Sequence, residues 1–398
     1  MKKIELLSPA GNIEKAKWAL LYGSDAVYIG GQEYSLRANT NNFSLEEIKE
    51  IVNIAHNENK KIYVTCNIIF HNKDFDGFKQ YITKLGEFGV DAIIVADISA
   101  INIIRKYAPS VEVHISTQQS SLNYESIKFY EKLGATRVVL GREASKEDIK
   151  LIKEKTNMEI EVFIHGAMCS ALSGRCVLSN YFTNRDSNRG GCSQVCRFAF
   201  NLFDESNAKI NSNVDYAFAS KDLSLLKYLN ELIELGVDSL KIEGRMRSNY
   251  YIASVLHVYR RNIDAFYNNN NFIYNPKDEN LLLRCSNREA VPQFFDKFPK
   301  KDEQYYSGRM ETTNQDFLAV VLSYNEKEKI ATITQRNYFS IEDKVVVFGP
   351  TLKEYEFVIR EIINSDNKNV EKANHPEEIL KIPLDIKVEA NFIIRKQI

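Results

Sequence analysis

One phrase of sequence, the end of a helix followed by a short apolar strand, occurs three times in this chain. Residues 235–242 read LGVDSLKI, residues 88–95 read FGVDAIIV and residues 133–140 read LGATRVVL. The glycine in each copy stands where a helix C-cap is expected, and the apolar, β-branched run after it is typical of a buried strand. A repeated helix-to-strand junction predicts repeated βα units and a parallel sheet.

The same alternation extends outward from these copies, from residue 4 to residue 267. Short apolar runs predict eight strands, at 4–7, 26–29, 62–69, 92–95, 112–116, 137–140, 159–164 and 239–242. Amphipathic segments predict eight helices, at 13–22, 45–57, 78–88, 98–107, 124–133, 146–155, 223–235 and 250–267. Eight such units favour an α/β fold of the closed (β/α)8 TIM-like barrel type over an open doubly wound sheet.

The pattern changes beyond the last of these helices. Four asparagines at 268–271 and the prolines that follow predict a boundary, with a linker segment over residues 271–310. Apolar and polar residues then alternate, which predicts strands at 317–324, 330–334, 344–348, 355–363 and 386–394. The expected organisation is a barrel over residues 1–270 and a small C-terminal β-barrel domain over residues 311–398.

Composition excludes several classes of protein. The 398 residues are 44% hydrophobic and 26% charged, which is typical of a folded globular chain and excludes a disordered or fibrous one. The net charge of -1 means that any binding of nucleic acid must come from a local basic patch. No apolar run reaches the roughly 18–20 residues of a membrane span. Glu5, Pro9 and Gly11 interrupt any signal-peptide core, so a cytoplasmic protein is expected.

Four of the six cysteines crowd into one insertion, residues 165–220, between the seventh strand and its helix. They are Cys169, Cys176, Cys192 and Cys196, separated by six, fifteen and three residues. In a reducing compartment such clustering indicates a metal or a metal cluster rather than disulfides. The lack of a C-x2-C knuckle favours an iron-sulfur cluster over structural zinc, and at this point both remain open.

Polar residues follow the predicted strands at the end where barrel enzymes carry their active sites. Arg142, Glu243 and Arg245 place cations and a carboxylate around one mouth, suited to an anionic small molecule or a phosphate backbone. These three and His165 are the candidate catalytic residues, with His165 or Glu243 expected to move a proton. The alternative is that the charges pair with one another and that His165 is an ordinary core histidine.

Four further residues are candidates for binding the substrate. Asn67 and Gln118 follow the third and fifth strands, where their amides either hydrogen-bond the edge of a nucleobase or close the rim of the barrel. Arg175 and Arg189 lie in the insertion, where guanidinium groups are expected to contact phosphate or carboxylate groups of a partner. The alternative for both arginines is to neutralise the charge of a thiolate-bound cluster.

Two neighbouring stretches carry a family resemblance. Residues 161–169 read EVFIHGAMC and residues 173–179 read SGRCVLS, and together they resemble the signature of the collagenase-like U32 peptidase family. Supporting stretches are LLSPAG at 6–11, HISTQ at 114–118 and KIEGRM at 241–246. The resemblance covers the chain from its start to about residue 264, and the remainder is similar to the family's small C-terminal β domain.

The resemblance implies a 4Fe-4S cluster on the four clustered cysteines. For the branch of tRNA hydroxylation proteins it implies tRNA as the partner, synthesis of 5-hydroxyuridine at the wobble position, and prephenate as a co-substrate. Other branches imply hydroxylation of ribosomal RNA or of a quinone precursor, and older descriptions imply a peptidase. The sequence contains no H-E-x-x-H or G-x-S-x-G motif, so a peptidase rests on the family label alone. A scaffold with a structural cluster is a third alternative.

Overall fold

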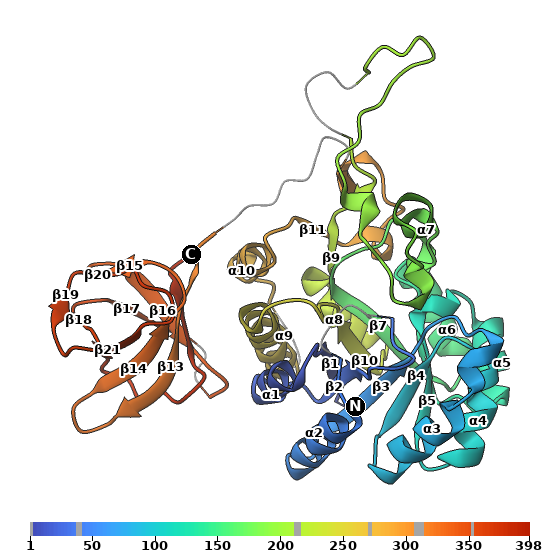
Figure 1. The fold of residues 1–398 in the computed structure, drawn as a ribbon, viewed down its shortest axis with the longest axis horizontal. Helices are drawn as coiled ribbons and strands as arrows, with labels where there is room; N and C mark the ends of the chain where they lie inside the picture. The colour runs from blue at the N-terminus through green and yellow to red at the C-terminus, as the bar shows by residue number, and fades with distance from the viewer. Residues whose placement is uncertain (1–2, 37–41, 211–215, 270–272, 306–313, 352–353) are drawn as a thin grey trace.

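The computed structural model describes residues 3–36, 42–210, 216–269, 273–305, 314–351 and 354–398, and the first part of the chain forms a closed barrel (Figure 1). The barrel has eight parallel strands: β1 (Glu5–Pro9), β2 (Ala26–Gly30), β3 (Lys61–Cys66), β4 (Ala92–Val95), β5 (Glu112–Ile115), β6 (Arg137–Val139), β7 (Glu159–Gly166) and β10 (Ser239–Ile242). Each pairs with the next, and β10 pairs with both β7 and β1, which closes the ring. The predicted TIM-like barrel is confirmed.

Helices surround the barrel on its outside (Figure 1). They are α1 (Ile13–Leu21), α2 (Leu45–Asn57), α3 (Phe78–Glu87), α4 (Ser99–Tyr107), α5 (Tyr124–Lys132), α6 (Lys146–Lys155), α8 (Leu229–Glu234) and α9 (Asn249–Asn269). Their apolar faces, together with the outward faces of the strands, form one continuous core. None of the helices in the described ranges combines the length and the apolarity that crossing a bilayer requires.

The helix ends follow the sequence signals. Ser44 and Glu47 form a capping box at the start of α2, in which the Ser44 hydroxyl accepts from the Glu47 N–H at 3.1 Å. Gly89, Gly134 and Gly236 follow their helices with φ angles of 77°, 94° and 73°. Residues with a Cβ enter this left-handed region only at a cost of about 1–2 kcal/mol, which explains the repeated glycine.

One predicted helix is wrong over its first part. The sequence predicts a helix at 223–235, but the chain first forms the strand β9 (Asp222–Ser224), and α8 begins only at Leu229. β9 pairs antiparallel with the end of β7 and parallel with β11 (Ala290–Val291). The backbone of this stretch finds its hydrogen bonds in the sheet, which overrides an apolar pattern that also fits a helix.

The insertion between β7 and β9 stands at the mouth of the barrel (Figure 1). It contains one short helix, α7 (Leu178–Thr183), and then an arm in which Phe200 pairs with Tyr216. The arm ends in β8 (Ala219–Ser220), which pairs antiparallel with β12 (Gln304–Tyr305). A long insertion with so little regular structure depends on side-chain contacts to stay in place.

The C-terminal part is a small β domain, as predicted. Its main sheet is antiparallel and curves into a half-barrel (Figure 1). In sheet order the strands are β17 (Tyr355–Val358), β16 (Lys344–Phe348), β22 (Ile393–Lys396), β13 (Phe317–Asn325), β14 (Ile330–Gln335), β21 (Ile379–Pro383), β18 (Ile362–Ile363) and β19 (Asn369–Val370). A smaller pair is formed by β15 (Phe339–Ser340) and β20 (Lys372–Ala373). The sequence analysis missed β21, because the exposed Ile379 is as apolar as the buried Leu380 and Ile382, so apolar and polar residues do not alternate.

The β domain packs against the outside of the barrel. Tyr250 of α9 stacks on Phe317, with ring centroids 4.9 Å apart, and Phe348 lies 6.1 Å from Tyr22. The segment expected as a linker, residues 271–310, contributes the helix α10 (Pro276–Ser286), which lies against α9. The two domains therefore share apolar contacts rather than a simple tether.

Replacing Arg284 by alanine is expected to loosen this attachment. Two guanidinium nitrogens of Arg284 donate to the two carboxylate oxygens of Asp316, at 2.6 and 2.5 Å, and Asp316 is only 1% exposed. In the variant the Asp316 carboxylate stays buried without this partner, which lowers the free energy of unfolding by about 3–5 kcal/mol. Arg336→Ala is the matched control, because its pair with Glu377 is exposed and is worth less than about 1 kcal/mol. Urea unfolding measures the free energy of unfolding of both variants, and equal losses in Arg284→Ala and Arg336→Ala would contradict the prediction.

Candidate functional site

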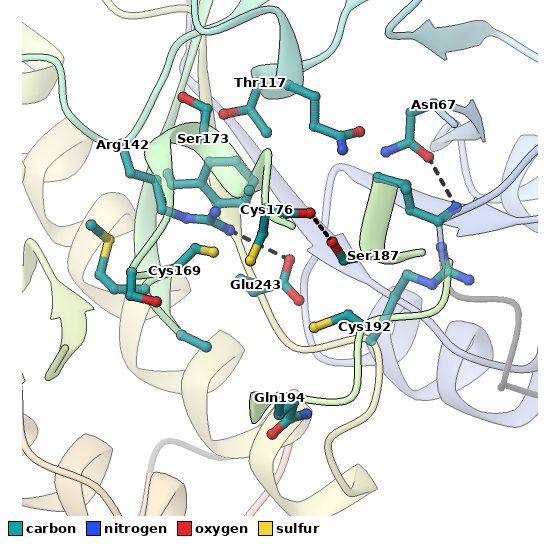
Figure 2. A pocket seen from close by; sticks show the side chains of 18 of the residues that line it. Asn67, Thr117, Arg142, Cys169, Ser173, Cys176, Ser187, Cys192, Gln194 and Glu243 are labelled. Atoms are coloured by element: carbon teal, nitrogen blue, oxygen red, sulfur yellow. Dashed lines mark hydrogen bonds and ion pairs between the residues drawn. The ribbon is translucent and has the colours of Figure 1, made fainter. Parts of the chain in front are cut away.

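A cavity of about 240 Å³ opens at the mouth of the barrel, between the strand ends and the insertion. All four clustered cysteines line it, and so do Asn67, Gln118, Arg142, Glu243 and Arg245. The C-terminal ends of parallel strands thus meet the loop that follows β7, at the position where barrel enzymes hold their substrates. Figure 2 shows Cys169, Cys176 and Cys192 arranged about the carboxylate of Glu243.

Arg142 and Glu243 face each other across the cavity. Arg142 Nη2 lies 3.6 Å from Glu243 Oε2, and the guanidinium carbon lies 3.8 Å from the centre of the Phe163 ring (Figure 2). The Tyr28 hydroxyl donates to the same carboxylate oxygen at 3.2 Å. The pair is largely shielded from solvent, with side chains 11% and 17% exposed, so its charges act at close range on any occupant of the cavity.

Arg245 braces the wall of the cavity. Its guanidinium donates to Ser35 Oγ at 2.9 Å and to Asn42 Oδ1 at 2.6 Å, which ties the loop after β2 to the end of β10. A Cβ on Gly30 would collide with this guanidinium, and one on Gly11 would collide with the Arg245 carbonyl. The close approaches explain both glycines, and they give Arg245 a positioning role.

The two candidate amides also line the cavity. Asn67 Oδ1 accepts from the Leu36 N–H at 3.3 Å, which holds the amide at the rim. Gln118 is buried, and its Oε1 has no hydrogen-bond partner within the described residues. A buried acceptor without a donor is costly, and a ligand that donates a hydrogen bond relieves that cost. Gln118 is therefore poised to accept from a ligand.

The four cysteines are free thiols on one cavity wall. Burial raises the pKa of the Cys169 thiol, whereas Cys192 is exposed. The Leu178 N–H donates to Cys176 Sγ over 3.3 Å. Across the described ranges, no group of three or more His, Cys, Asp or Glu side chains is spaced to hold a single metal ion.

His165 does not line the cavity, and this corrects the sequence-based expectation. Its ring lies 5.9 Å from that of Tyr251 and 5.8 Å from that of Tyr259, both on α9, outside the barrel. Lys241 pairs with Phe163 but the next residue of β10 pairs with His165, so β7 has a bulge that breaks the alternation of its side chains. Burial lowers the pKa of His165 to about 3, so the ring is neutral in the core. Glu243 remains as the candidate for moving a proton.

Arg175 and Arg189 hold the insertion in place instead of lining the cavity. Arg175 Nε donates to the Gln118 carbonyl at 2.6 Å. Arg189 makes a bidentate pair with Asp74, at 2.6 and 2.8 Å, and also donates to the Ile69 carbonyl. Both arginines connect the insertion to loops that follow barrel strands, and their expected contact with substrate stays a prediction.

Replacing Arg189 by alanine is expected to lower stability at neutral pH and to make stability depend less on pH between about 4 and 2. The Arg189 hydrogen bonds lower the pKa of Asp74 to about 2. A carboxyl whose pKa is lower in the folded state stabilises it at neutral pH, and that contribution is lost as pH falls from about 4 to about 2. Without Arg189 the pKa of Asp74 returns toward its ordinary value of 3.8. NMR titration of Asp74 and acid unfolding measure the change; an unaltered titration would contradict it.

Three cations on the cavity wall were missed by the sequence analysis as site residues. Lys241 is buried, donates to Glu161 Oε1 at 2.6 Å and lies 4.4 Å from the centre of the Tyr28 ring. Strand alternation places it on the same face as Glu243, and this signal was available. Arg197 and Arg288 come from separate loops and approach one buried carboxylate, Asp222, at 3.5 and 3.8 Å. No local pattern brings these two together.

The cavity has an excess of positive charge. Among the described residues that line it, the cations are Arg142, Arg197, Lys241, Arg245 and Arg288, and the carboxylate is Glu243. Glu161 and Asp222, which lie behind the wall, lower the imbalance to five cations against three carboxylates. A recess with this field attracts anions, and its low exposure strengthens the effect. Tyr28 and Phe163 add apolar ring surface to the same wall.

A buried ion network fills the barrel below this cavity. Arg137 lies 2.6 Å from Glu5, 2.7 Å from Glu159 and 3.1 Å from Glu161. Glu161 is fully buried, which alone would raise its pKa, but Lys241 and Arg137 hold the pKa below its usual value. Glu161 of this network holds Lys241 in place, so the cavity wall is connected to the buried ion pairs of the barrel.

Comparison with known families identifies this architecture. Residues 11–305 match Peptidase family U32, and residues 313–395 match the Peptidase family U32 C-terminal domain. The chain belongs to the U32 family. Both parts of the fold, the barrel with its insertion and the β half-barrel, are therefore features of one U32 protein.

The U32 relatives carry different descriptions. The "tRNA hydroxylation protein P1" of Bacillus subtilis (strain 168) is 46% identical, over 99% of this chain and 95% of that protein. The "Collagenase" of Porphyromonas gingivalis (strain ATCC BAA-308 / W83) is 30% identical over 96% and 95%. The "23S rRNA 5-hydroxycytidine C2501 synthase" of Escherichia coli (strain K12) is 41% identical over 66% of this chain and 40% of that protein. Membership of the U32 family alone therefore does not decide between RNA modification and peptide cleavage.

Proposed function

We propose that this protein is an RNA hydroxylase that converts the wobble uridine of tRNA to 5-hydroxyuridine. The single observation that carries the proposal is the 46% identity, over nearly the full length of both chains, to a protein described as a tRNA hydroxylation protein. The relative described as a 5-hydroxycytidine synthase adds a second RNA-directed U32 protein of the same reaction class. Tyr28 and Phe163 in the cavity offer ring surface for a pyrimidine.

An iron-sulfur cluster on Cys169, Cys176, Cys192 and Cys196 is part of this proposal. The support is that four free thiols line one cavity and are not spaced for a single ion within the described residues. When bound there, a 4Fe-4S cluster supplies electron transfer at the edge of the reaction cavity. The cationic wall around the thiols suits a group with net negative charge.

The remaining roles fall to residues of the cavity wall. Arg142, Arg197 and Arg288 bind the carboxylates of an anionic co-substrate, for which we propose prephenate, a cyclic dicarboxylate. Gln118 Oε1 accepts a hydrogen bond from the uracil ring. Glu243 Oε2 is the group at the cavity that accepts or holds a proton beside the bound pyrimidine, and Arg142 and Tyr28 hold that carboxylate in place.

The proposal is tested by mass spectrometry of tRNA nucleosides. Deleting the gene in its host is expected to remove 5-hydroxyuridine and nucleosides derived from it, and the wild-type gene is expected to restore them. A Glu243→Gln gene is expected to restore less than about 1% of the wild-type level, since general acid–base groups contribute about 10²–10⁴-fold. Unchanged tRNA with loss of a hydroxylated nucleoside from ribosomal RNA would move the substrate to ribosomal RNA.

A peptidase is the second candidate, favoured by the description of the Porphyromonas gingivalis relative. Against it, no histidine lines the cavity among the described residues, and His165 lies in the core. A cysteine or serine nucleophile needs a neighbouring base, so the thiols here lack the usual partner for peptide cleavage. Incubation of the purified, iron-loaded protein with gelatin separates the candidates, since cleavage that is lost in Cys169→Ala would favour the peptidase.

A further inference from the structure

A second cavity, of about 450 Å³, adjoins the first at the mouth of the barrel. The two cavities share the wall formed by Met168, Cys169, Ser170 and Leu178. The other walls carry aromatic rings, Tyr216 and Phe218 from the arm and Phe294, together with the neutral polar residues Ser220, Gln293 and Gln304. An occupant of the second cavity would therefore lie next to an occupant of the first.

An aromatic surface continues from this cavity over the outside of the insertion. We define it by five residues whose rings form an unbroken series: Tyr181, Phe182, Phe200, Phe218 and Tyr216. The successive ring centroids are 5.1, 5.6, 5.3 and 5.0 Å apart. Tyr181 is 82% exposed, Phe182 is 50% exposed and Phe218 is 46% exposed.

This exposure requires an explanation, because aromatic rings normally dominate the buried surface of a protein. Leu172 and Val177, 55% and 72% exposed, extend the apolar area near the cavity. Arg185 is also exposed, and within the described residues its guanidinium has no ion pair. Rings, apolar side chains and a cation therefore share the surface around the second cavity.

We propose that the aromatic surface and the second cavity bind the nucleotides that flank the target uridine in a single-stranded loop of RNA. The inference rests on the proposed function and adds the place where the polymer lies. Bases of unpaired RNA stack on aromatic side chains, and neutral amides and hydroxyls hydrogen-bond their edges. Gln293, Gln304 and Ser220 supply such groups beside Phe218, and Arg185 lies in the same insertion to meet phosphate.

The shared wall is what favours RNA over a protein partner. A polymer that places one unit in the 240 Å³ cavity must leave along that wall, and the wall leads directly into the second cavity. The polymer's neighbouring units then meet aromatic rings and neutral polar groups, as bases do in single-strand grooves, with Glu143 as the charged side chain among the lining residues of the second cavity. The overall charge of -1 gives no general attraction for nucleic acid, so a local surface of this kind is required.

Fluorescence anisotropy tests the inference directly on the full-length, iron-loaded protein. The probe is a fluorescein-labelled tRNA anticodon stem-loop with uridine at the wobble position, compared with a fully paired RNA of the same length. Phe182→Ala and Phe218→Ala are each expected to raise the Kd for the stem-loop about 5- to 150-fold, the range for loss of one base–ring stack. Phe218→Trp is expected to restore binding, since it keeps a ring.

Phe129→Ala is the matched control, because Phe129 is 52% exposed on α5, away from the insertion. It is expected to leave the Kd unchanged. Thermal melting verifies that the variants fold, as expected for exposed rings. Unchanged Kd values in Phe182→Ala and Phe218→Ala would overturn the inference. So would a wild-type dimer in sedimentation that these variants split, because the rings would then bind a second copy of the chain.

Nucleoside mass spectrometry separates failure of this inference from failure of the proposed function. If wild-type protein restores 5-hydroxyuridine but the ring variants restore it equally, the inference fails while the function stands. If wild-type protein restores none, the function fails, and the anisotropy series still decides whether the surface binds single-stranded RNA.

Discussion

Replacing Cys192 by serine is expected to remove the proposed iron-sulfur cluster and to reduce the proposed RNA hydroxylation to background. Cys192 is exposed, so the substitution leaves the packing of the barrel intact. A serine hydroxyl stays protonated at neutral pH and is a poor ligand for iron, whereas the thiolate is the form that binds metal. One missing ligand from four loosens the whole group, because its binding free energy depends on all of them.

Cys285→Ser is the matched control for this experiment. Cys285 is buried in α10, away from the cavity, and its thiol donates to the Leu282 carbonyl at 3.3 Å, a bond that a hydroxyl also makes. Iron and acid-labile sulfide per chain, measured after anaerobic purification, are expected to fall in Cys192→Ser and to persist in Cys285→Ser. Full iron and activity in Cys192→Ser, or one zinc ion and no iron in the wild type, would contradict the cluster.

Replacing Arg137 by methionine is expected to unfold the protein or bring it close to unfolding at neutral pH. Arg137 is the shared partner of Glu5, Glu159 and Glu161, and Glu161 is fully buried. Removing one side of a buried ion pair costs about 3–5 kcal/mol. That loss is a large part of a typical net stability of about 5–15 kcal/mol.

The pH dependence of this variant gives a sharper test. In the wild type the pKa of Glu161 lies below its usual 4.5, so the network stabilises the fold above that pH and the contribution is lost as pH falls. Without Arg137 the carboxylates lose this counter-charge. Protonation then relieves the repulsion, so Arg137→Met is expected to be more stable at pH 5 than at pH 8, whereas the contribution of Glu161 in the wild type changes only below about pH 4.5.

Two further variants complete that experiment. Adding Glu5→Gln to Arg137→Met is expected to recover part of the lost stability at pH 8, because Arg137 is the cation paired with Glu5 and an uncompensated charge is removed. Lys17→Met is the surface control, since its pair with Glu50 is about half exposed and is worth less than about 1 kcal/mol. Urea unfolding followed by circular dichroism measures the series. A loss in Arg137→Met no larger than that in Lys17→Met would show that the network is dispensable.

The barrel was predictable because its signals are local and repeated. Each strand is a buried apolar run bounded by a helix end, and the glycines at 89, 134 and 236 mark where helices stop. In the C-terminal sheet the strand β21 was missed, because its exposed Ile379 is apolar and hides the alternation of the buried Leu380 and Ile382. At 223–235 an apolar run fits either a helix or a strand, and long-range pairing of β9 with β7 and β11 decides between them.

The candidate site also has a part that the sequence predicts and a part that it does not. Strand ends placed Arg142, Glu243 and the amides correctly on the cavity, since alternation and parallel direction are enough for that. His165 was misplaced because a one-residue bulge in β7 reverses the side on which a side chain lies, and nothing in the local sequence marks it. Arg197 and Arg288 meet through Asp222, a contact between loops far apart in the chain, which no spacing rule detects.

The order of the strands also bears on how this protein is made. The ring closes only when β10 inserts between β1 and β7, and Glu5 and its partner Ser239 are 234 residues apart. During synthesis the first seven strands emerge with two bare edges, and the cysteine-rich stretch leaves the ribosome before the strand that seals them. The four thiols are therefore accessible to solvent before the ring of strands closes.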